Sequence, residues 1–454
     1  MNLSKTTRVL PDYRGLDWVD VSLPSKPQNW IEGNKHCIRQ RNKSRSETRQ
    51  SIQQLVDQYR WHWPKRPIVF ISDLHADADA FFVSLVASGG IKKTGAEDHQ
   101  FKLTPEGKGL LFILGGDFFD KGPSNLRLLR AVKLLIGTGA RVRLLAGNHD
   151  VRVLFGMRSA AVADDPNNSH FFIRMGVKAV PFLCEIRDAC LSHKGALKGV
   201  PGHKACRALL YPDKRWWQQF PQQADQEMSA AQISKEMRKI EQKMGSFEQA
   251  CAAASLSMRE VYAATLKWQQ MFLSPQGDFF WFYKRMRLAY RKGSFLFVHA
   301  GMDDHIAGML HDCGTNGLNG LFKKQLHGSA YEFYYGSVAN TIRTKYRCQD
   351  KPLSRKGAMH AHQAGIHAIV HGHKNLHRGQ RISVRKSMLN FECDVTLDIG
   401  SRSREGLIGR GGGATLIHPA GYILGISSDY DRIKVFDTSA ILTTQSGISG
   451  TLQT

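Results

Sequence analysis

The chain has 454 residues, 42% of them hydrophobic, which is sufficient for one or two globular domains with a large core. Its 63 lysine and arginine residues against 39 aspartate and glutamate residues give a formal net charge of +24, and such a field attracts phosphorylated substrates, nucleic acid or acidic membrane surfaces. No stretch approaches about 18 apolar residues, which excludes a membrane-spanning helix, and the 8 cysteines form no Cys-x-x-Cys pair, which excludes the common zinc and redox motifs.

The basic residues are spread along the whole chain, so two interpretations of the charge stay open. A solvated basic surface without a dedicated partner accounts for it as well as a nucleic-acid-binding groove does. Thiols outside any motif are typical of a reducing compartment, and no apolar segment follows the first charged residues. We therefore expect a cytoplasmic protein.

The first part of the chain predicts an extension followed by a parallel sheet. Residues 1–65 combine tryptophans with an arginine-rich segment, and we expect them to form an N-terminal extension that wraps the core. From residue 66 onward, apolar runs alternate with helical patterns, as in a parallel sheet with right-handed crossovers. The runs at 68–71, 110–114 and 142–145 lack polar alternation, which is typical of strands covered on both faces.

A helical insertion is expected to interrupt the domain at about 203–292, where Gln, Lys, Met and Ala dominate the composition. The pattern there predicts helices over 226–244 and 247–271. Strand patterns then resume at 295–298, 368–371, 395–400, 414–417 and 422–426. We therefore predict one catalytic domain over 66–436 and a small, polar C-terminal tail over 437–454.

Five of the apolar runs end in side chains that bind metals. These side chains are Asp73, His75, Asp117, Asn148, His299 and His373. Ligands bind at the carboxyl ends of strands in α/β sheets, so the repeated pattern indicates one shared site. For Asp117 taken alone, capping of the next helix would be an equally good explanation.

The chemistry of this set favours a pair of divalent ions. Oxygen and imidazole donors without thiolate suit Mn, Fe or Zn. Six ligands are too many for one ion that must leave room for substrate, but they suit two ions that share a bridging carboxylate. Two cations about 3.5–4 Å apart hold an attacking hydroxide and a phosphate oxygen together.

His149 follows one of these ligands and is placed to protonate the leaving group as a general acid. An imidazole needs a partner that fixes its tautomer, and Asp120 is the expected partner.

The motifs occur in an order that resembles a known superfamily. They are Asp-x-His at 73–75, Gly-Asp-x-x-Asp at 116–120, Gly-Asn-His-Asp at 147–150, His-Ala-Gly at 299–301 and Gly-His at 372–373. This order resembles the calcineurin-like metallophosphoesterases, and within them the PPP-type phosphoprotein phosphatase branch, especially its bacterial-like and Shewanella-like members. The resemblance implies a four-layer α/β/β/α sandwich with a mostly helical insertion.

The resemblance also implies a role for each residue. Asp73 and His75 would bind the first metal, Asp117 would bridge, Asn148, His299 and His373 would bind the second, and His149 with Asp120 would form the acid pair. His193, which also follows an apolar stretch, is an alternative to His299, but the strand pattern before His299 is cleaner.

The phosphate-binding residues depart from the family pattern. Lys121 stands where the family has an arginine, and a lysine offers a point charge in place of a bidentate fork. Lys121 and Asn148 are expected to contact the substrate phosphate. Arg343 and Arg347 are the candidates for the second arginine of the family.

We therefore expect a metal-dependent phosphomonoesterase, with manganese as a suitable metal, that uses a hydroxide held by two metal ions. Its substrate would be a phosphorylated protein, on Ser, Thr or Tyr, or a small phosphoester. The alternatives are hydrolysis of dinucleoside polyphosphates or of nucleic-acid phosphodiesters and, in another class, a non-catalytic basic RNA-binding protein.

Overall fold

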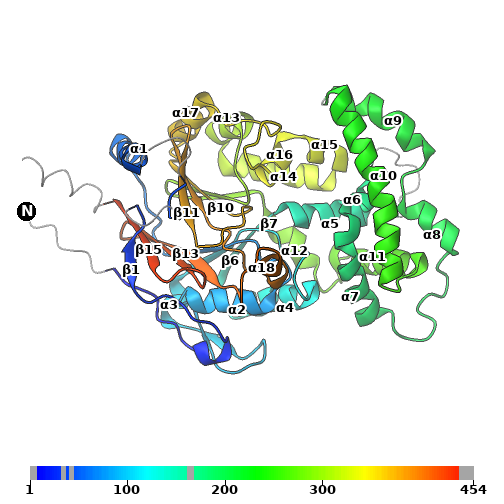
Figure 1. Cartoon of the computed structure of the whole chain (residues 1–454), viewed down its shortest axis with the longest axis horizontal. Helices are drawn as coiled ribbons and strands as arrows, with labels where there is room; N and C mark the ends of the chain where they lie inside the picture. The colour runs from blue at the N-terminus through cyan, green and yellow to red at the C-terminus, as the bar shows by residue number, and fades with distance from the viewer. Residues whose placement is uncertain (1–7, 32–36, 40–44, 161–167, 227, 439–454) are drawn as a thin grey trace, which may run out of the picture.

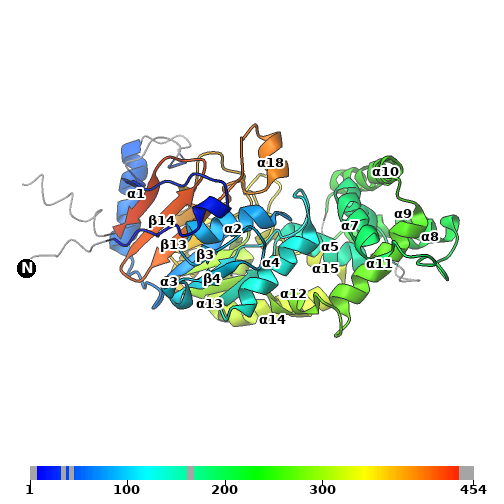
Figure 2. The ribbon, with the colours of Figure 1, turned by 90° about the horizontal axis from the view of Figure 1, so that it is seen from below.

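The computed structural model describes residues 8–31, 37–39, 45–160, 168–226 and 228–438. Two β-sheets pack face to face at its centre, and helices cover both outer faces (Figure 1, Figure 2). This arrangement confirms the predicted α/β sandwich of four layers.

The first sheet has eight strands. In spatial order they are β1 (Pro27–Asn29), β15 (Ile433–Asp437), β14 (Tyr422–Ser427), β13 (Gly413–His418), β2 (Ile68–Ile71), β5 (Leu111–Leu114), β6 (Arg141–Leu145) and β7 (Met286–Arg287). The strands from β2 to β7 run parallel to one another. The predicted parallel unit is therefore the half of this sheet in which the strands precede Asp73, Asp117 and Asn148.

The second sheet has five strands. Their order is β11 (Arg381–Arg385), β12 (Met388–Glu392), β10 (Ala368–His371), β9 (Phe295–Val298) and β8 (Ala289–Lys292). Strands β12, β10 and β9 are parallel. A separate hairpin pairs β3 (Ile91–Lys93) with β4 (Phe101–Leu103).

The apolar runs lack alternation because both faces of each strand are buried. Phe70 packs between the sheets, where its ring centroid lies 5.9 Å from that of Phe297. Its neighbour Val69 faces the opposite way and joins the core beneath the helices. Burial of apolar surface on both faces stabilises the strands that carry the site.

Helices complete the outer layers. They include α2 (Ala78–Ala87), α3 (Pro105–Gly109) and α4 (Asn125–Gly137) beside the first sheet, and α13 (Asp304–Asp312), α14 (Gly314–His327) and α17 (Arg355–Gln363) beside the second. The remaining ones there are η1 (Leu16–Trp18), α1 (Arg45–Gln58), α15 (Ala330–Tyr335), α16 (Ser337–Thr341) and α18 (Ile399–Arg404).

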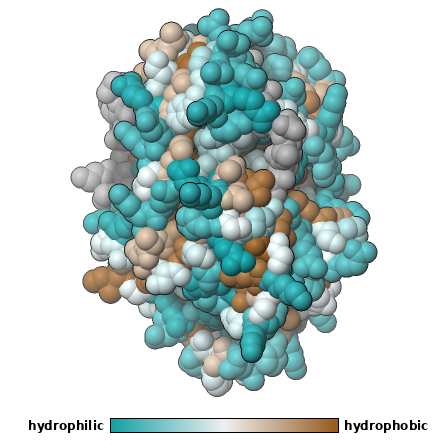
Figure 3. All heavy atoms as spheres, turned by 90° about the vertical axis from the view of Figure 1, so that its right-hand side faces the viewer, coloured by the Kyte–Doolittle hydropathy of each residue, from teal (hydrophilic) through white to brown (hydrophobic). Residues whose placement is uncertain are grey.

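A group of helices extends from one end of the sandwich (Figure 1). It comprises α5 (Asn148–Ser159), α6 (Phe171–Met175), η2 (Gly176–Ala179), α7 (Val180–Cys190), α8 (His203–Leu210), α9 (Lys214–Ala224), α10 (Ala230–Ala253), α11 (Met258–Leu273) and α12 (Phe280–Arg285). The face that this end presents is mostly hydrophilic, with scattered hydrophobic side chains (Figure 3).

Three details of the predicted elements are wrong. The helix predicted over 247–271 is interrupted, because α10 ends at Ala253 and the Ser257 side chain caps the start of α11 by accepting the Glu260 N–H. The predicted break between helices at 245–246 is absent, because the buried stripe of Ile240, Phe247 and Cys251 continues α10 past this point. The predicted strand at 395–400 is instead a loop that leads into α18, where the Asp398 side chain accepts the Ser401 N–H at 2.7 Å and caps the helix.

The predicted division into extension, domain and tail stays a prediction. Strand β1, from the predicted extension, pairs with β15 and so adds to the first sheet. Strands β7 and β8 fall inside the predicted insertion, and β7 is part of the first sheet while β8 is part of the second. Of the predicted tail, residues 439–454 lie outside the described residues.

Candidate active site

The six strand-end side chains come together at one edge of the sandwich. Strands β2, β5 and β6 of the first sheet and β9 and β10 of the second all direct their carboxyl ends to this edge. Four of the six residues are fully buried, and Asn148 and His373 are partly buried. Two groups of potential metal ligands lie here, one of His75, Asp117 and His149 and one of Asp117, His299 and His373, and in each group the ligand atoms fall within 4.8 Å of one another.

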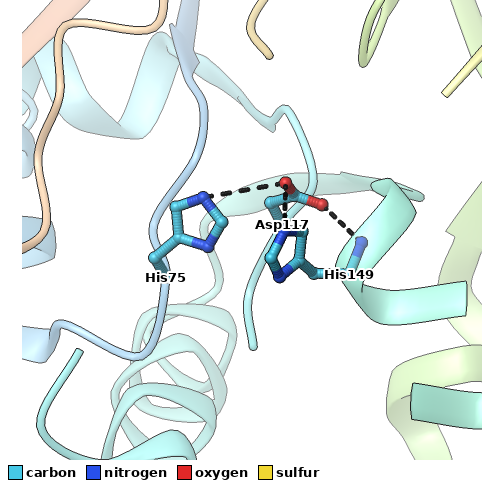
Figure 4. Close-up of side chains that lie close together, drawn as sticks. All are labelled: His75, Asp117 and His149. Atoms are coloured by element: carbon cyan, nitrogen blue, oxygen red, sulfur yellow. Dashed lines mark hydrogen bonds and ion pairs between the residues drawn. The ribbon is translucent and has the colours of Figure 1, made fainter. Parts of the chain in front are cut away.

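Asp117 belongs to both groups. Its Oδ2 lies 3.7 Å from His75 Nε2 and 3.9 Å from His149 Nε2 (Figure 4). On its other side, Oδ2 lies 3.4 Å from His299 Nε2. These distances exceed hydrogen-bond length, but they suit groups that ligate a common ion.

The second group adds His373 and, nearby, Asn148. His299 Nε2 lies 3.2 Å from His373 Nδ1 and 3.3 Å from Asn148 Oδ1. With Asp117, these atoms form the set of oxygen and imidazole donors that the sequence predicts for one of the two ions.

Hydrogen bonds fix the ring nitrogen that each histidine presents. His75 Nδ1 bonds to the Phe119 carbonyl at 3.0 Å, and His299 Nδ1 bonds to the Gly115 carbonyl at 2.8 Å, so their Nε2 atoms face Asp117. His373 is reversed, because its Nε2 bonds to the Arg343 carbonyl at 3.0 Å and its Nδ1 faces the site. Such backbone contacts are the usual way in which a protein orients metal-binding imidazoles.

Asp73 is held by the loops around it. Its Oδ2 accepts the His373 N–H at 2.9 Å and the Ser72 hydroxyl at 2.6 Å, while its Oδ1 lies 4.0 Å from His75 Nε2. The backbone of Asp73, His75, Asp117 and His373 adopts positive φ angles of 58°, 41°, 57° and 66°. Each such residue costs about 1–3 kcal/mol, and strain of this kind clusters at functional sites.

Burial and neighbouring charges shift the titration of the site. Burial opposes ionisation of Asp117, but His299 and His149 outweigh it and hold the pKa of Asp117 well below its usual value. Burial, and then Lys121, holds the pKa of His75 well below its usual value. Burial likewise lowers the pKa of His373. His299 differs, because the Asp117 carboxylate outweighs burial and raises the pKa of His299 to about 10, so this imidazole must lose a proton before it binds a metal ion.

The expected acid pair is in contact. His149 Nδ1 lies 2.7 Å from Asp120 Oδ2. Arg152 Nη2 donates a short hydrogen bond to the same carboxylate oxygen and lies 2.8 Å from His149 Nδ1. Burial, followed by the charge of Arg152, lowers the pKa of His149 to about 4.

The expected phosphate-binding residues differ in their distance from this centre. Lys121 reaches into it, with Nζ 2.6 Å from His75 Nε2. Arg343 borders it through its backbone carbonyl, whereas Arg347 is exposed and its side chain contacts none of the ligand groups in the described part of the chain. The alternative ligand His193 is exposed and follows helix α7, not a strand, so the geometry favours His299.

Two residues with clear contacts at the site were missed by reasoning from the sequence. Asp150 accepts the backbone N–H groups of Asp117, Phe118 and Gly147 at 2.7–2.9 Å and so ties the two strand-end loops together. Arg152 is the other. Its only sequence signal is its position three residues after His149, which places both on one side of α5.

Comparison with known proteins identifies the domain. Residues 66–233 match the family model described as calcineurin-like phosphoesterase. The chain contains a calcineurin-like phosphoesterase domain. The domain is accordingly of the metallophosphoesterase type, a family of metal-dependent hydrolases, and His and Asp groups of the chain can bind metal.

The solved structures that resemble this chain have low sequence identity to it. The cold-active protein-tyrosine phosphatase of the psychrophile Shewanella sp. aligns with 82% of this chain and 80% of its own, at 13% identity and a TM-score of 0.41. A protein serine/threonine phosphatase from Saccharomyces cerevisiae, with similarity to human phosphatase PP5, aligns with 87% and 90%, at 10% identity and a TM-score of 0.37. No curated protein matches the sequence significantly.

The remaining expectations concern partners and location. None of the helices in the described parts of the chain is long and apolar enough to cross a membrane. A phosphorylated substrate is consistent with the phosphoesterase domain, and a nucleic-acid partner gains no support from the comparisons.

Proposed function

We propose that the chain is a phosphomonoesterase of the PPP type that hydrolyses phosphorylated proteins with the help of two divalent ions, Mn, Fe or Zn. The observation that carries the proposal is the position of Asp117, whose carboxylate belongs to both groups of ligand atoms. A carboxylate shared in this way can hold two cations side by side, as in a two-metal site.

The donor set fits the ions. Asp73, His75 and Asp117 would hold one ion, and Asp117, Asn148, His299 and His373 would hold the other. When bound, the ions would hold the phosphate, offset the charge that develops on it and lower the pKa of a water molecule.

The acid pair would act on the leaving group. His149 is held through Nδ1 by Asp120 at 2.7 Å, and because its pKa is about 4 it would have to take up a proton when the anionic substrate binds before it donates one to the departing oxygen. Lys121 and Asn148 would contact the phosphate, and Arg343 and Arg347 stay the candidates for a further cationic contact.

Hydrolysis of p-nitrophenyl phosphate in the presence of Mn tests this proposal. We expect Asp117→Asn to lower kcat/KM by at least about 100-fold, as is usual when a group that stabilises developing charge is removed. The matched control is Asp79→Asn, because Asp79 lies on α2 and pairs with Arg127 at 2.7 Å, outside the ligand groups. An Asp117→Asn protein with the activity of the control would contradict the proposal.

A substrate panel tests the finer assignment. Phosphopeptides that carry phosphoserine, phosphothreonine or phosphotyrosine should be hydrolysed faster than dinucleoside polyphosphates or single-stranded nucleic acid. The opposite order would favour one of the alternative phosphoesterase activities.

A further inference from the structure

Six basic side chains gather where α5, α6, η2, α10 and the loop after α16 meet, and one of them, Arg152, contacts the acid pair. We call these residues the basic cluster: Arg152, Arg174, Lys178, Lys239, Lys243 and Arg343. Figure 1 shows α5 running from the strand ends toward α6 and α10, and α10 packs against both α6 and η2. The helices at this end therefore bring positive charge to the candidate active site.

Two members of the basic cluster, Arg152 and Arg343, contact residues of the candidate active site. Arg152 Nη2 lies 2.8 Å from His149 Nδ1, and the Arg343 carbonyl bonds to His373 Nε2 at 3.0 Å. Burial, and then the charges of Arg152 and Lys121, lower the pKa of Lys178. A group bound by the cluster would thus lie next to the phosphate that is hydrolysed.

Contacts within the cluster hold its members together. The guanidinium of Arg174 lies 3.9 Å from the centre of the Tyr334 ring, and that of Arg343 lies 4.9 Å from the same ring. Lys243 donates a short hydrogen bond to the Arg174 carbonyl, and so anchors α10 to α6. Although burial opposes it, the charges of Arg174 and Arg343 lower the pKa of Tyr334 to about 7.

Positive charge exceeds negative charge at this place. Arg152 pairs with Asp120, and Arg174 pairs with Glu236. Among the residues that the structure describes, no carboxylate lies within ion-pair distance of the three lysines of the cluster or of Arg343. Burial, and then Arg152 and Arg174, lower the pKa of Lys243 to about 7.

Two buried donors in the cluster also lack a partner. Arg174 is 5% exposed, and within the described part of the chain its Nε has no hydrogen-bond acceptor. The same holds for Arg152 Nε. A buried guanidinium donor without an acceptor is costly, and an anion that accepts from it would remove the cost.

We propose that the basic cluster binds a second phosphate group of the substrate, adjacent to the phosphate that is hydrolysed. The proposal rests on the proposed function and deepens it, because it names the substrate class as phosphoesters with at least two phosphate groups. Guanidinium and ammonium groups are the usual partners of phosphate, and one scissile phosphate already has Lys121 and the ions as partners.

Calorimetric binding of inorganic tripolyphosphate and of inorganic phosphate to the Mn-loaded protein tests the cluster independently of steady-state kinetics. We expect tripolyphosphate to bind at least about tenfold more tightly than phosphate, and the double variant Lys239→Gln/Lys243→Gln to lose about tenfold in tripolyphosphate affinity. The control is Arg238→Gln on the same helix, because Arg238 is exposed and, among the described residues, its side chain bonds to the Ser234 carbonyl alone. Equal affinities for the two anions, or an unchanged double variant, would overturn the proposal.

Kinetics then identify the source of the second phosphate. The kcat/KM ratio of a doubly to a singly phosphorylated peptide, and that of a dinucleoside polyphosphate to a nucleoside monophosphate, are measured in the wild type and in the double variant. A wild-type ratio above about ten for either pair, reduced in the double variant, supports the proposal and names the source. Ratios near one for both pairs would overturn it. A protein with no hydrolytic activity contradicts the proposed function, and the calorimetry still decides on the cluster.

Discussion

At the scale of single residues, Arg152 is the side chain that most changes the expected picture of the site. Lys121 stands where a bidentate arginine is expected, and a lysine cannot supply the fork. Arg152 brings a guanidinium to the same region from α5, in contact with Asp120 and His149. A guanidinium therefore reaches the edge of the site from a different element, with its Nη2 paired to Asp120.

Arg152→Ala should raise KM for a phosphomonoester by at least about tenfold, because a hydrogen bond between charged groups contributes about 1.5–3 kcal/mol. Arg152→Lys should recover part of this loss, since it restores charge without the fork. Steady-state kinetics measure both variants. Arg130→Ala, at an exposed position on α4, is the control, and a wild-type KM for Arg152→Ala would refute the role.

At the scale of elements, a glycine after one strand leaves space for the metal-binding side chain that follows a strand of the other sheet. A Cβ at Gly372 would lie 2.0 Å from Asp73 Oδ2 and 2.1 Å from Ser72 Oγ. The loop after β10 therefore packs on the carboxylate that follows β2, with no space for a side chain between them.

Gly372→Ala should weaken Mn binding by at least about tenfold, because the Asp73 carboxylate must move. Gly308→Ala is the matched control, since the nearest atom to its Cβ would be His360 Nδ1 at 3.8 Å. Titration of the metal-free proteins with Mn measures the affinities. Equal affinities for the two variants would show that the close approach does not matter.

Strand β12 stabilises the loop after β10 through a buried carboxylate. Glu392, whose side chain is 1% exposed, accepts from Lys374 Nζ at 2.9 Å and from Arg381 Nε at 2.9 Å. Burial opposes ionisation of Glu392, but Lys374 is the strongest of the groups that outweigh it and hold its pKa well below 4.5.

Glu392→Gln should lower the free energy of unfolding at pH 7 by about 3–5 kcal/mol, because Lys374 would be left buried without its partner. The folded-state pKa lies below the unfolded value, so this stabilisation is present above about pH 4.5 and is lost as the pH falls below it. Urea unfolding at neutral and at acidic pH measures the difference between wild type and variant. A difference that grows as the pH falls would be inconsistent with this origin.

The fold and the residue types of the site could be predicted from sequence patterns, whereas most contacts within the site could not. The strands ending near Asp73 and Asp117 were predictable because burial on both faces gives apolar runs, and parallel strand ends meet at one edge. The contacts of Asp150 with the backbone N–H of Asp117 were not, because they depend on the approach of two loops 33 residues apart in sequence. The continuity of α10 past Gly245 likewise depends on tertiary packing.

At the scale of the whole molecule, the structure shows where part of the +24 net charge lies. The sequence alone allowed a solvated basic surface without a dedicated partner. The structure gathers part of that charge in the basic cluster, at the junction of the helical end and the strand ends, where an anionic substrate would benefit from it. Fold, charge and ligand groups thus converge at the edge where Asp117 lies.

The central claim is that Asp117 joins two metal ions, and the metal content of purified protein tests it most directly. After loading with Mn and removal of free metal, elemental analysis should give about two ions per wild-type chain and fewer than one per Asp117→Asn chain, because both ions lose a ligand. Two ions in both proteins, or at most one ion in the wild type, would contradict a centre built on this carboxylate.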